Sequence, residues 1–227
     1  MRHVMAPGNV SHVRVKVCCI GSIEEARTAI EAGADAVGLV STMPSGPGVI
    51  SEDLIREIAR TIPPPIATFL LTCHQQVDEI VAQQRRCGTN TVQLCDRVVD
   101  GSYTELRAAM PGVSIVQVIH VNGLESVEEA VNIAPHVSAL LLDSGNQKLA
   151  VKELGGTGRT HDWRVSAEIR QAVRVPIFLA GGLRAENVRD AIAQVRPWGV
   201  DLCSGVRSEG HLNHSKLKAF MLQVRSC

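Results

Sequence analysis

The chain has 227 residues, a length that suits one α/β barrel or two smaller domains. Its 23 Lys and Arg residues balance its 23 Asp and Glu residues, so no net charge favours binding to nucleic acid or to an anionic membrane. Aromatic residues make up only 3% of the sequence, which argues against stacking platforms for single-stranded nucleic acid.

The first segment in chain order is residues 1–12, which contains Pro7 and Gly8 and shows no hydrophobic periodicity. We expect this segment to be a flexible leader before the folded part. From residue 13 onward, short runs of β-branched and other apolar residues alternate with stretches in which apolar residues recur at helical spacing. Eight runs predict strands, at residues 13–20, 35–40, 66–72, 91–94, 114–121, 139–143, 176–180 and 199–203.

The stretches between these strands predict amphipathic helices, among them residues 23–32, 52–61, 75–86, 126–134, 165–173 and 185–194. Strands separated by helices run parallel, because a right-handed crossover returns the chain to the same end of the sheet. Eight such units predict a single-domain α/β protein, a (β/α)8 TIM barrel over residues 13–227. A doubly wound open sheet is the alternative, but the sequence lacks the Gly-x-Gly-x-x-Gly turn after the first strand that would favour it.

Loops rich in small residues follow the last three predicted strands. Glycine lets backbone N–H groups converge on an anion, and barrels commonly hold phosphate on the loops after strands seven and eight. These loops therefore predict a phosphorylated small-molecule substrate. They are Gly155-Gly156-Thr157-Gly158, Ala180-Gly181-Gly182-Leu183 and Ser204-Gly205-Val206.

Two residues at predicted strand ends can transfer protons. Asp143 follows an apolar strand, where a carboxylate is costly to bury without a partner or a function. Cys18 ends the first predicted strand, although a thiol in a strand is more often a buried apolar residue. Across a barrel mouth, a thiol and a carboxylate can act as base and acid, which is an arrangement suited to an isomerase.

Several motifs together resemble the phosphoribosylanthranilate isomerase family of tryptophan biosynthesis, from residue 13 to the C-terminus. They are Lys16-Val17-Cys18, Gly33-Ala34-Asp35-Ala36-Val37-Gly38, Val92-Gln93-Leu94, Leu141-Leu142-Asp143-Ser144, Gly155-Gly156-Thr157-Gly158-Arg159-Thr160-His161-Asp162-Trp163, Ala180-Gly181-Gly182-Leu183, Glu186-Asn187-Val188, Val195-Arg196-Pro197-Trp198-Gly199-Val200-Asp201 and Ser204-Gly205-Val206.

The resemblance implies an Amadori rearrangement of N-(5'-phosphoribosyl)anthranilate to a 1-amino-1-deoxyribulose phosphate, with no cofactor and no metal. It implies that Cys18 is the general base at the sugar C2 and that Asp143 is the general acid at the ring oxygen. A thiol of ordinary pKa is mostly protonated at neutral pH, and Lys16, on the same strand face, is a candidate to favour the thiolate. The phosphate pocket would be lined by Gly156, Gly158, Gly182, Ser204 and Gly205.

The chain departs from the family pattern where the anthranilate should bind. Gly48 stands where the family has the arginine that binds the anthranilate carboxylate, and Cys95 and Asp96 replace a histidine and a glycine. Cys19 replaces a glycine after the catalytic cysteine, and His120 stands where an arginine is expected. Losing a bidentate guanidinium costs roughly 1.5–3 kcal/mol of binding.

The sequence therefore leaves two versions of the isomerase open. One is a divergent phosphoribosylanthranilate isomerase with a substitute cation, for which Arg97 is the candidate. The other is a paralogue that acts on a different phosphoribosyl amine or phosphosugar without that carboxylate. In either version we expect the aglycone side of the site to include Lys16, Cys95, Arg97 and His120.

Other classes of function are weaker alternatives. A zinc enzyme would need several soft ligands at one barrel mouth, and a non-catalytic phosphosugar-binding protein would not need both Cys18 and Asp143. Seven cysteines without zinc-finger spacing, no secretory signal and no membrane-spanning run predict a cytoplasmic monomer or homodimer with free thiols. The Gly and Pro content of residues 42–49 is compatible with a lid. The candidate zinc ligands are Cys18, Cys19, Cys73, His74, Cys95, His120 and Asp143.

Overall fold

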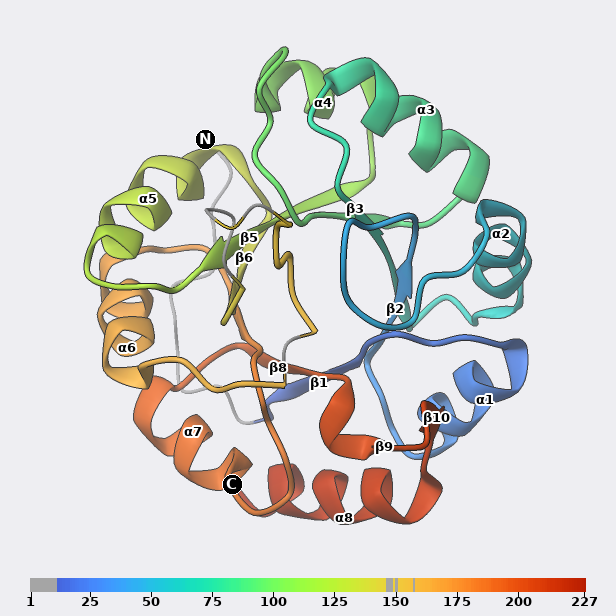
Figure 1. Ribbon diagram of the computed structural model, residues 1–227, viewed down its shortest axis with the longest axis vertical. Helices are drawn as coiled ribbons and strands as arrows, with labels where there is room; N and C mark the ends of the chain where they lie inside the picture. Colours follow the sequence, from blue (N-terminus) through green and yellow to red (C-terminus); the bar gives the residue numbers. More distant parts are fainter. Residues whose placement is uncertain (1–11, 146–148, 150, 157) are drawn as a thin grey trace.

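A computed structural model describes residues 12–145, 149, 151–156 and 158–227. Eight parallel strands close into a barrel in chain order, and helices surround it on the outside (Figure 1). The barrel closes where the first strand pairs with the eighth, with Lys16 beside Asp201 and Val17 beside Leu202. The expected single-domain (β/α)8 barrel is therefore confirmed, whereas residues 1–11 of the expected leader lie outside the described residues.

The strands of the barrel are shorter than the sequence predicts at several ends. The first strand ends at Val17 and the eighth at Leu202, so Cys18, Cys19 and Cys203 stand in the loops just beyond the barrel. The strands are β1 (Arg14–Val17), β2 (Ala36–Val40), β3 (Ala67–Thr72), β4 (Thr91–Leu94), β5 (Ser114–His120), β6 (Ala139–Asp143), β7 (Ile177–Leu179) and β8 (Gly199–Leu202).

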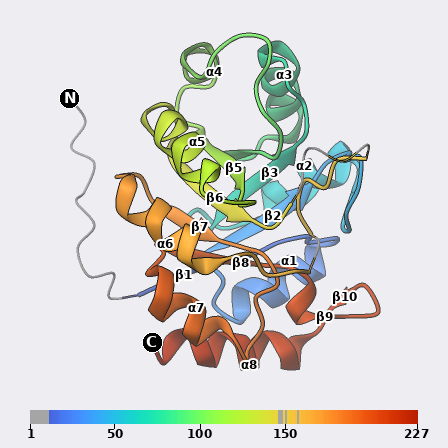
Figure 2. The same cartoon turned by 60° about the vertical axis from the view of Figure 1, so that its left-hand side comes forward.

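Two helices, α4 and α8, lie outside the ranges predicted from the sequence. A short hairpin of β9 (Arg207–Ser208) and β10 (His211–Leu212) lies beside α8 (Figure 2). The α-helices are α1 (Ile23–Glu31), α2 (Glu52–Thr61), α3 (Val77–Cys87), α4 (Tyr103–Ala109), α5 (Glu125–Ile133), α6 (Trp163–Ala172), α7 (Val188–Val195) and α8 (His214–Arg225), with short 3-10 helices at η1 (Ala134–His136) and η2 (Ser204–Val206).

Local sequence explains why the helices begin where they do. Ser22, Ser51 and Asn213 precede α1, α2 and α8, and each side chain accepts a hydrogen bond from a backbone N–H of the first turn. Ser102 and Glu105 form a capping box at α4, which stabilises a helix of only seven residues. These caps fix the helix starts, and thereby the lengths of the loops that carry the site.

Two apolar clusters hold the barrel together. The larger lies between the strands and the helices and includes fully buried residues such as Ile55, Leu70 and Phe220. The smaller fills the barrel itself, where Phe69 and Phe178 pack edge to face with ring centroids 5.8 Å apart. Because the interior is filled, a ligand can bind only at an end of the barrel.

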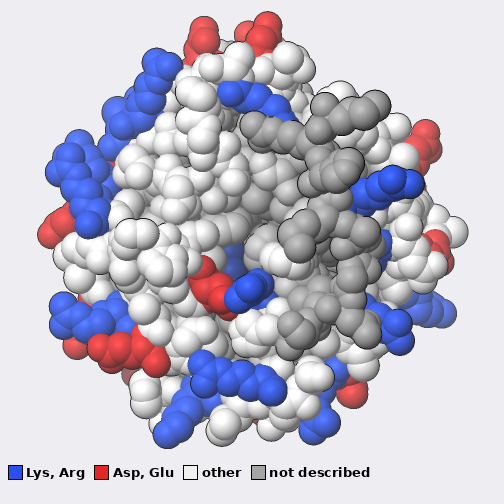
Figure 3. All heavy atoms as spheres, turned by 180° about the vertical axis from the view of Figure 1, so that it is seen from behind, with Lys and Arg blue, Asp and Glu red and all other residues white. Residues whose placement is uncertain are grey.

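The face seen from behind in Figure 3 carries Lys and Arg side chains interspersed with Asp and Glu around its rim. This mixture matches the zero formal net charge of the chain. Among the described residues, no helix is both long enough and apolar enough to cross a membrane.

Candidate active site

A pocket with a cavity volume of about 70 Å³, open to solvent at its mouth, lies at the carboxyl ends of the barrel strands. The pocket combines apolar side chains, thiols, two carboxylates and the backbone of several glycine loops. Its lining includes Cys18, Cys19, Val40, Met43, Ser45, Leu71, Gln93, Cys95, Asp143, Leu154, Gly156, Gly158, Gly182, Asp201, Cys203 and Ser204.

Cys18 lies at one side of the pocket, above a buried ion pair. Lys16 has no exposed surface, and its Nζ is 2.9 Å from Oδ1 of Asp201. Burial lowers the pKa of Lys16, but attraction to Asp201 and then to Cys18 outweighs it, so the pKa is raised. Burial in turn raises the pKa of Asp201, with Lys16 opposing that shift. The lysine therefore places a positive charge beneath the thiol.

Gly38 makes room for this arrangement. A Cβ at Gly38 would lie 2.8 Å from Sγ of Cys18 and 3.0 Å from Nζ of Lys16. Both distances are shorter than an ordinary van der Waals contact. Glycine at this position of β2 thus lets the thiol and the ammonium group occupy the same corner of the pocket.

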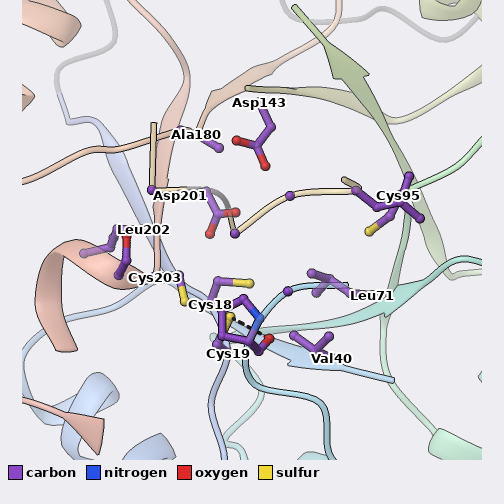
Figure 4. Close-up of a pocket in the computed structure, with 18 of the residues that line it drawn as sticks. Cys18, Cys19, Val40, Leu71, Cys95, Asp143, Ala180, Asp201, Leu202 and Cys203 are labelled. Carbon is purple, nitrogen blue, oxygen red and sulfur yellow. Dashed lines mark hydrogen bonds between the residues drawn. The ribbon is translucent and has the colours of Figure 1, made fainter. Parts of the chain in front are cut away.

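Asp143 ends β6 and enters the pocket on another side, facing the thiols (Figure 4). It is 8% exposed, and its Oδ1 accepts a hydrogen bond of 2.7 Å from the backbone N–H of Ser144. Gly155 and Gly181, both at positive φ, pass close to the carboxylate, where a Cβ would lie 2.8 Å from Oδ2 and 3.2 Å from Oδ1, respectively. The structure therefore brings Cys18 and Asp143 to the same pocket.

Three of the predicted glycines, together with Ser204, line the end of the pocket where the loops after β6, β7 and β8 meet. Gly156, Gly158 and Gly182 all have positive φ. A Cβ at Gly182 would meet the backbone of Arg159 at 2.8 Å, and a Cβ at Gly158 would lie 3.4 Å from Oγ of Ser204. The loops after β6, β7 and β8 therefore converge without side chains between them.

Gly205 does not line this pocket. A Cβ there would lie 2.1 Å from the carbonyl oxygen of Leu183, so Gly205 packs against the loop after β7. The expectation that Gly205 contacts the phosphate stays a prediction. Its lack of a side chain lets the loops after β7 and β8 approach each other.

Two departures from the family pattern, Cys19 and Gly48, are in direct contact. Cys19 has a φ of 62°, a conformation that favours glycine. Gly48 has a φ of 80°, and a Cβ there would lie 2.5 Å from Cβ of Cys19. A side chain at residue 48 therefore has no room while residue 19 carries one, which gives a steric reason for the missing arginine.

The loop of residues 42–49 reaches across the pocket to the loop after β6. The hydroxyl of Ser45 donates a hydrogen bond of 2.7 Å to the carbonyl oxygen of Lys152. Pro47 packs near Gly156, where a Cβ would lie 2.6 Å from Cδ of the proline. The two loops thus meet over the pocket.

The side of the pocket formed by β2, β3 and β4 is mostly apolar. Cys95 is buried there, and burial raises the pKa of its thiol. Gln93 is 3% exposed, and its Oε1 has no hydrogen-bond partner within the described part of the chain. His120 is not among the lining residues, and its Nε2 is 3.0 Å from the carbonyl oxygen of Cys95. His120 therefore supports the loop after β4 from behind.

The structure does not bring Arg97 to the pocket. Its side chain is 61% exposed, and its guanidinium pairs with Glu129 at 2.9 Å. The neighbouring Asp96 is instead buried and forms an ion pair with Lys152. The carbonyl oxygen of Lys152 accepts the hydrogen bond from Ser45, so Lys152 brings a cation from the loop after β6 to the edge of the pocket.

The candidate zinc ligands do not form a metal site. In the described ranges, no group of three or more His, Cys, Asp or Glu side chains is placed to hold one ion. All seven cysteines have free thiols.

Sequence reasoning missed Gln93, Asp201 and Lys152. Strand alternation gives a signal for the first two, because Gln93 and Asp201 are polar residues within otherwise apolar strands. Lys152 has no such signal, because only the folded loop brings it to Asp96.

The fold and the site define a (β/α)8-barrel protein with its ligand pocket at the carboxyl ends of the strands. A family model described as N-(5'phosphoribosyl)anthranilate (PRA) isomerase matches residues 15–223. An N-(5'-phosphoribosyl)anthranilate isomerase of Methanocella arvoryzae is 35% identical over 213 residues, which cover 93% of this chain and 98% of the relative. The chain belongs to the N-(5'-phosphoribosyl)anthranilate isomerase family.

Solved structures give the same result. One is a phosphoribosyl anthranilate isomerase in complex with reduced 1-(o-carboxyphenylamino)-1-deoxyribulose 5-phosphate. It is 29% identical, with a TM-score of 0.76, over 95% of this chain and all of that chain. Another shows monomers made from the dimeric enzyme of Thermotoga maritima. It is 28% identical, with a TM-score of 0.77 and the same coverage.

Proposed function

We propose that the protein catalyses the Amadori rearrangement of N-(5'-phosphoribosyl)anthranilate to the 1-amino-1-deoxyribulose phosphate. The observation that carries this proposal is the presence of Cys18 and Asp143 in one pocket, with converging glycine loops at its other end. A base and an acid on different sides of a bound sugar can move a proton between carbon and oxygen atoms of the same molecule. Membership of the isomerase family supports the same reaction.

In this reaction Asp143 donates a proton to the ring oxygen, and the ribose ring opens to an imine. Cys18, as thiolate, then removes the proton from C2, and the resulting enolamine becomes the ketone. Lys16 places its ammonium group in the same corner of the pocket as the sulfur of Cys18. The reaction needs no external oxidant or reductant, because C1 is reduced as C2 is oxidised within one molecule.

We assign the phosphate to Gly156, Gly158, Gly182 and Ser204. Glycine loops present backbone N–H groups to an anion without side chains in the way. No Lys or Arg is among the described lining residues, so backbone donors would carry most of the phosphate binding.

The anthranilate ring fits the apolar side of the pocket, where Val40, Met43 and Leu71 lie. For its carboxylate we propose Lys152 in place of Arg97. Lys152 is about one-third exposed and is held by buried Asp96 beside this side of the pocket, whereas Arg97 points to solvent and pairs elsewhere. A charge-assisted hydrogen bond to a carboxylate contributes roughly 1.5–3 kcal/mol.

One observation favours a second candidate, an isomerase of a phosphoribosyl amine without a carboxylate. The pocket contains no arginine where the family binds the anthranilate, and the positive charge of Lys152 is offset by Asp96. A neutral aglycone would suit such a pocket better than an anionic one.

A fluorescence assay distinguishes the two candidates. Purified protein is given N-(5'-phosphoribosyl)anthranilate formed in situ or the corresponding aniline derivative, and Lys152→Met is compared with Arg97→Met. We expect turnover of the anthranilate compound, with KM raised about tenfold to a hundredfold in Lys152→Met and unchanged in Arg97→Met. Efficient turnover of only the aniline derivative, with no effect of Lys152→Met, would establish the second candidate instead.

We further propose that the enzyme acts in the cytoplasm as a monomer or homodimer. Seven free thiols suit a reducing compartment. The dimeric Thermotoga maritima relative supports self-association as one option.

A further inference from the structure

Three thiols meet at the carboxyl ends of β1 and β8, and we call Cys18, Cys19 and Cys203 the thiol cluster (Figure 4). The register of the two strands explains why they meet. Lys16 pairs with Asp201 in the ladder, and both side chains face the barrel interior. Just beyond these strands, Cys18 and Cys203 line the same pocket.

Cys19 joins the cluster only because of an unusual backbone conformation. A φ of 62° costs a residue with a side chain roughly 1–2 kcal/mol. The Cys19 thiol lines the same pocket as Cys18 and Cys203, and it donates a hydrogen bond of 3.6 Å to the carbonyl oxygen of Pro47. A strained thiol placed between two others is a reason to look for chemistry at this position.

Cys203 and Cys19 differ in the direction in which their surroundings shift the pKa of the thiol. The hydrogen bond from Cys19, followed by the Arg207 guanidinium, holds the pKa of Cys203 below its ordinary value although burial opposes this. The hydrogen bonds to Cys18 and Cys203 raise the pKa of Cys19 well above its ordinary value. The charged and titratable groups that face Cys203 are Cys19, Arg207 and Asp201.

Arg207 is fixed in place beside this pair. Its guanidinium pairs with Glu25 at 3.0 Å and donates a hydrogen bond to the carbonyl oxygen of Cys19. Its Nε is buried and has no hydrogen-bond partner among the described residues. The arginine therefore supplies positive charge to Cys203 without having to move.

We propose that Cys203 and Cys19 form a peroxide-reactive thiol site that closes into a reversible disulfide next to the substrate pocket. The thiolate of Cys203 attacks a hydroperoxide and becomes a sulfenic acid, and the peroxide is reduced to water or an alcohol. The thiol of Cys19 then attacks this sulfur, releases water and forms the S–S bond. Each disulfide consumes one peroxide and two electrons from the two thiols.

Cys19 and Cys203 line one pocket just beyond the ends of the paired strands β1 and β8, and a disulfide would need their Cα atoms to lie roughly 4.4–6.8 Å apart. Cys203 is partly exposed at the pocket, so a small peroxide can reach it. A bond between Cys19 and Cys203 would remove the thiol contacts around Cys18. We expect the disulfide to lower isomerase turnover, and this expectation rests on the proposed function. Formation of the disulfide itself does not depend on that function.

Mass spectrometry tests the site independently of activity. The full-length protein is treated with hydrogen peroxide, denatured, alkylated and digested, with and without prior reduction. We expect a disulfide between the peptides that contain Cys19 and Cys203, and recovery of both thiols after reduction. Because Cys18 and Cys19 are adjacent, the Cys19→Ala variant shows which of them is bonded.

Matched variants decide the outcome. Cys203→Ala should abolish the disulfide, and Cys19→Ala should leave Cys203 to proceed to the sulfinic acid. Cys73→Ala is the control, because Cys73 is also partly exposed but burial raises the pKa of its thiol. The proposal is overturned if the wild-type protein forms no disulfide, or if the bond persists in Cys19→Ala as a link from Cys18. Disulfide formation in a protein without isomerase activity would uphold this site and refute only the proposed function.

Discussion

The contact between Cys19 and Gly48 predicts that substitutions at these two positions are energetically coupled. In Gly48→Ala, the new Cβ would lie 2.5 Å from Cβ of Cys19, whereas carbon atoms in contact prefer about 3.5–4.0 Å. In the Cys19→Gly background that atom and the sulfur are gone, and the nearest remaining atom is Cα of residue 19, 3.0 Å from the new Cβ. We therefore expect Gly48→Ala to be far less destabilising when residue 19 is glycine.

The magnitude has two parts. Placing alanine at a φ of 80° costs roughly 1–2 kcal/mol, and overpacking of this kind adds roughly 1–3 kcal/mol. The first part remains in the double variant, and the second should largely disappear. The coupling free energy should therefore be roughly 1–3 kcal/mol, and for a chain of this size each kcal/mol lowers Tm by about 2–4 °C.

Urea unfolding of the wild type, the two single variants and the double variant gives the coupling directly. Gly112→Ala is the matched control, since Gly112 has a φ of 87° but a Cβ there would meet nothing within 4 Å. It reports the cost of the backbone conformation alone. Effects of Cys19→Gly and Gly48→Ala that add to within about 0.5 kcal/mol would refute the steric explanation for the missing arginine.

Two further predictions concern the acid–base corner and the hairpin. Gly38→Ala should lower kcat by at least about tenfold with little change in KM, because its Cβ would displace the sulfur of Cys18 and the ammonium group of Lys16. Steady-state kinetics measures kcat and KM separately. An unchanged kcat would contradict this role of Gly38. Burial raises the pKa of Glu25, but hydrogen bonds from Arg207 and two backbone N–H groups lower it overall. The stability contributed by Glu25 is thus complete above its unfolded-state pKa of about 4.3, and it is lost as pH falls through the lower folded value. Glu25→Gln should therefore flatten the curve of unfolding free energy against pH below about pH 4.5. Parallel curves for the wild type and the variant would contradict this role of Glu25.

Much of the fold is predictable from this sequence because the apolar runs and the alternation of strands with helices indicate the same architecture. The β-branched runs give all eight barrel strands, and their alternation with helical stretches gives the parallel order. The short helix α4 was not among the predicted ranges, because its seven residues carry too little periodicity and depend on the capping box at Ser102. Strand ends are less certain because pairing, and not composition, ends a strand, which is why β1 stops at Val17.

The site is predictable where function depends on strand ends and not on loops. Cys18 and Asp143 meet in the pocket because barrel geometry brings all strand ends to one face. The aglycone side is less predictable, since nothing local indicates that Arg97 pairs with Glu129 or that Lys152 reaches Asp96. Those contacts join segments far apart in the sequence, and loop conformation decides them.

The central claim is that Cys18 and Asp143 act as base and acid in the rearrangement of N-(5'-phosphoribosyl)anthranilate. The most direct test is the fluorescence decay of this substrate with wild-type protein, Cys18→Ala and Asp143→Asn, each checked for a native circular dichroism spectrum. We expect turnover by the wild type and a loss of at least about a hundredfold in kcat for both variants. Turnover that persists in either folded variant would contradict the assigned role of that residue, and no turnover by folded wild-type protein would contradict the anthranilate substrate.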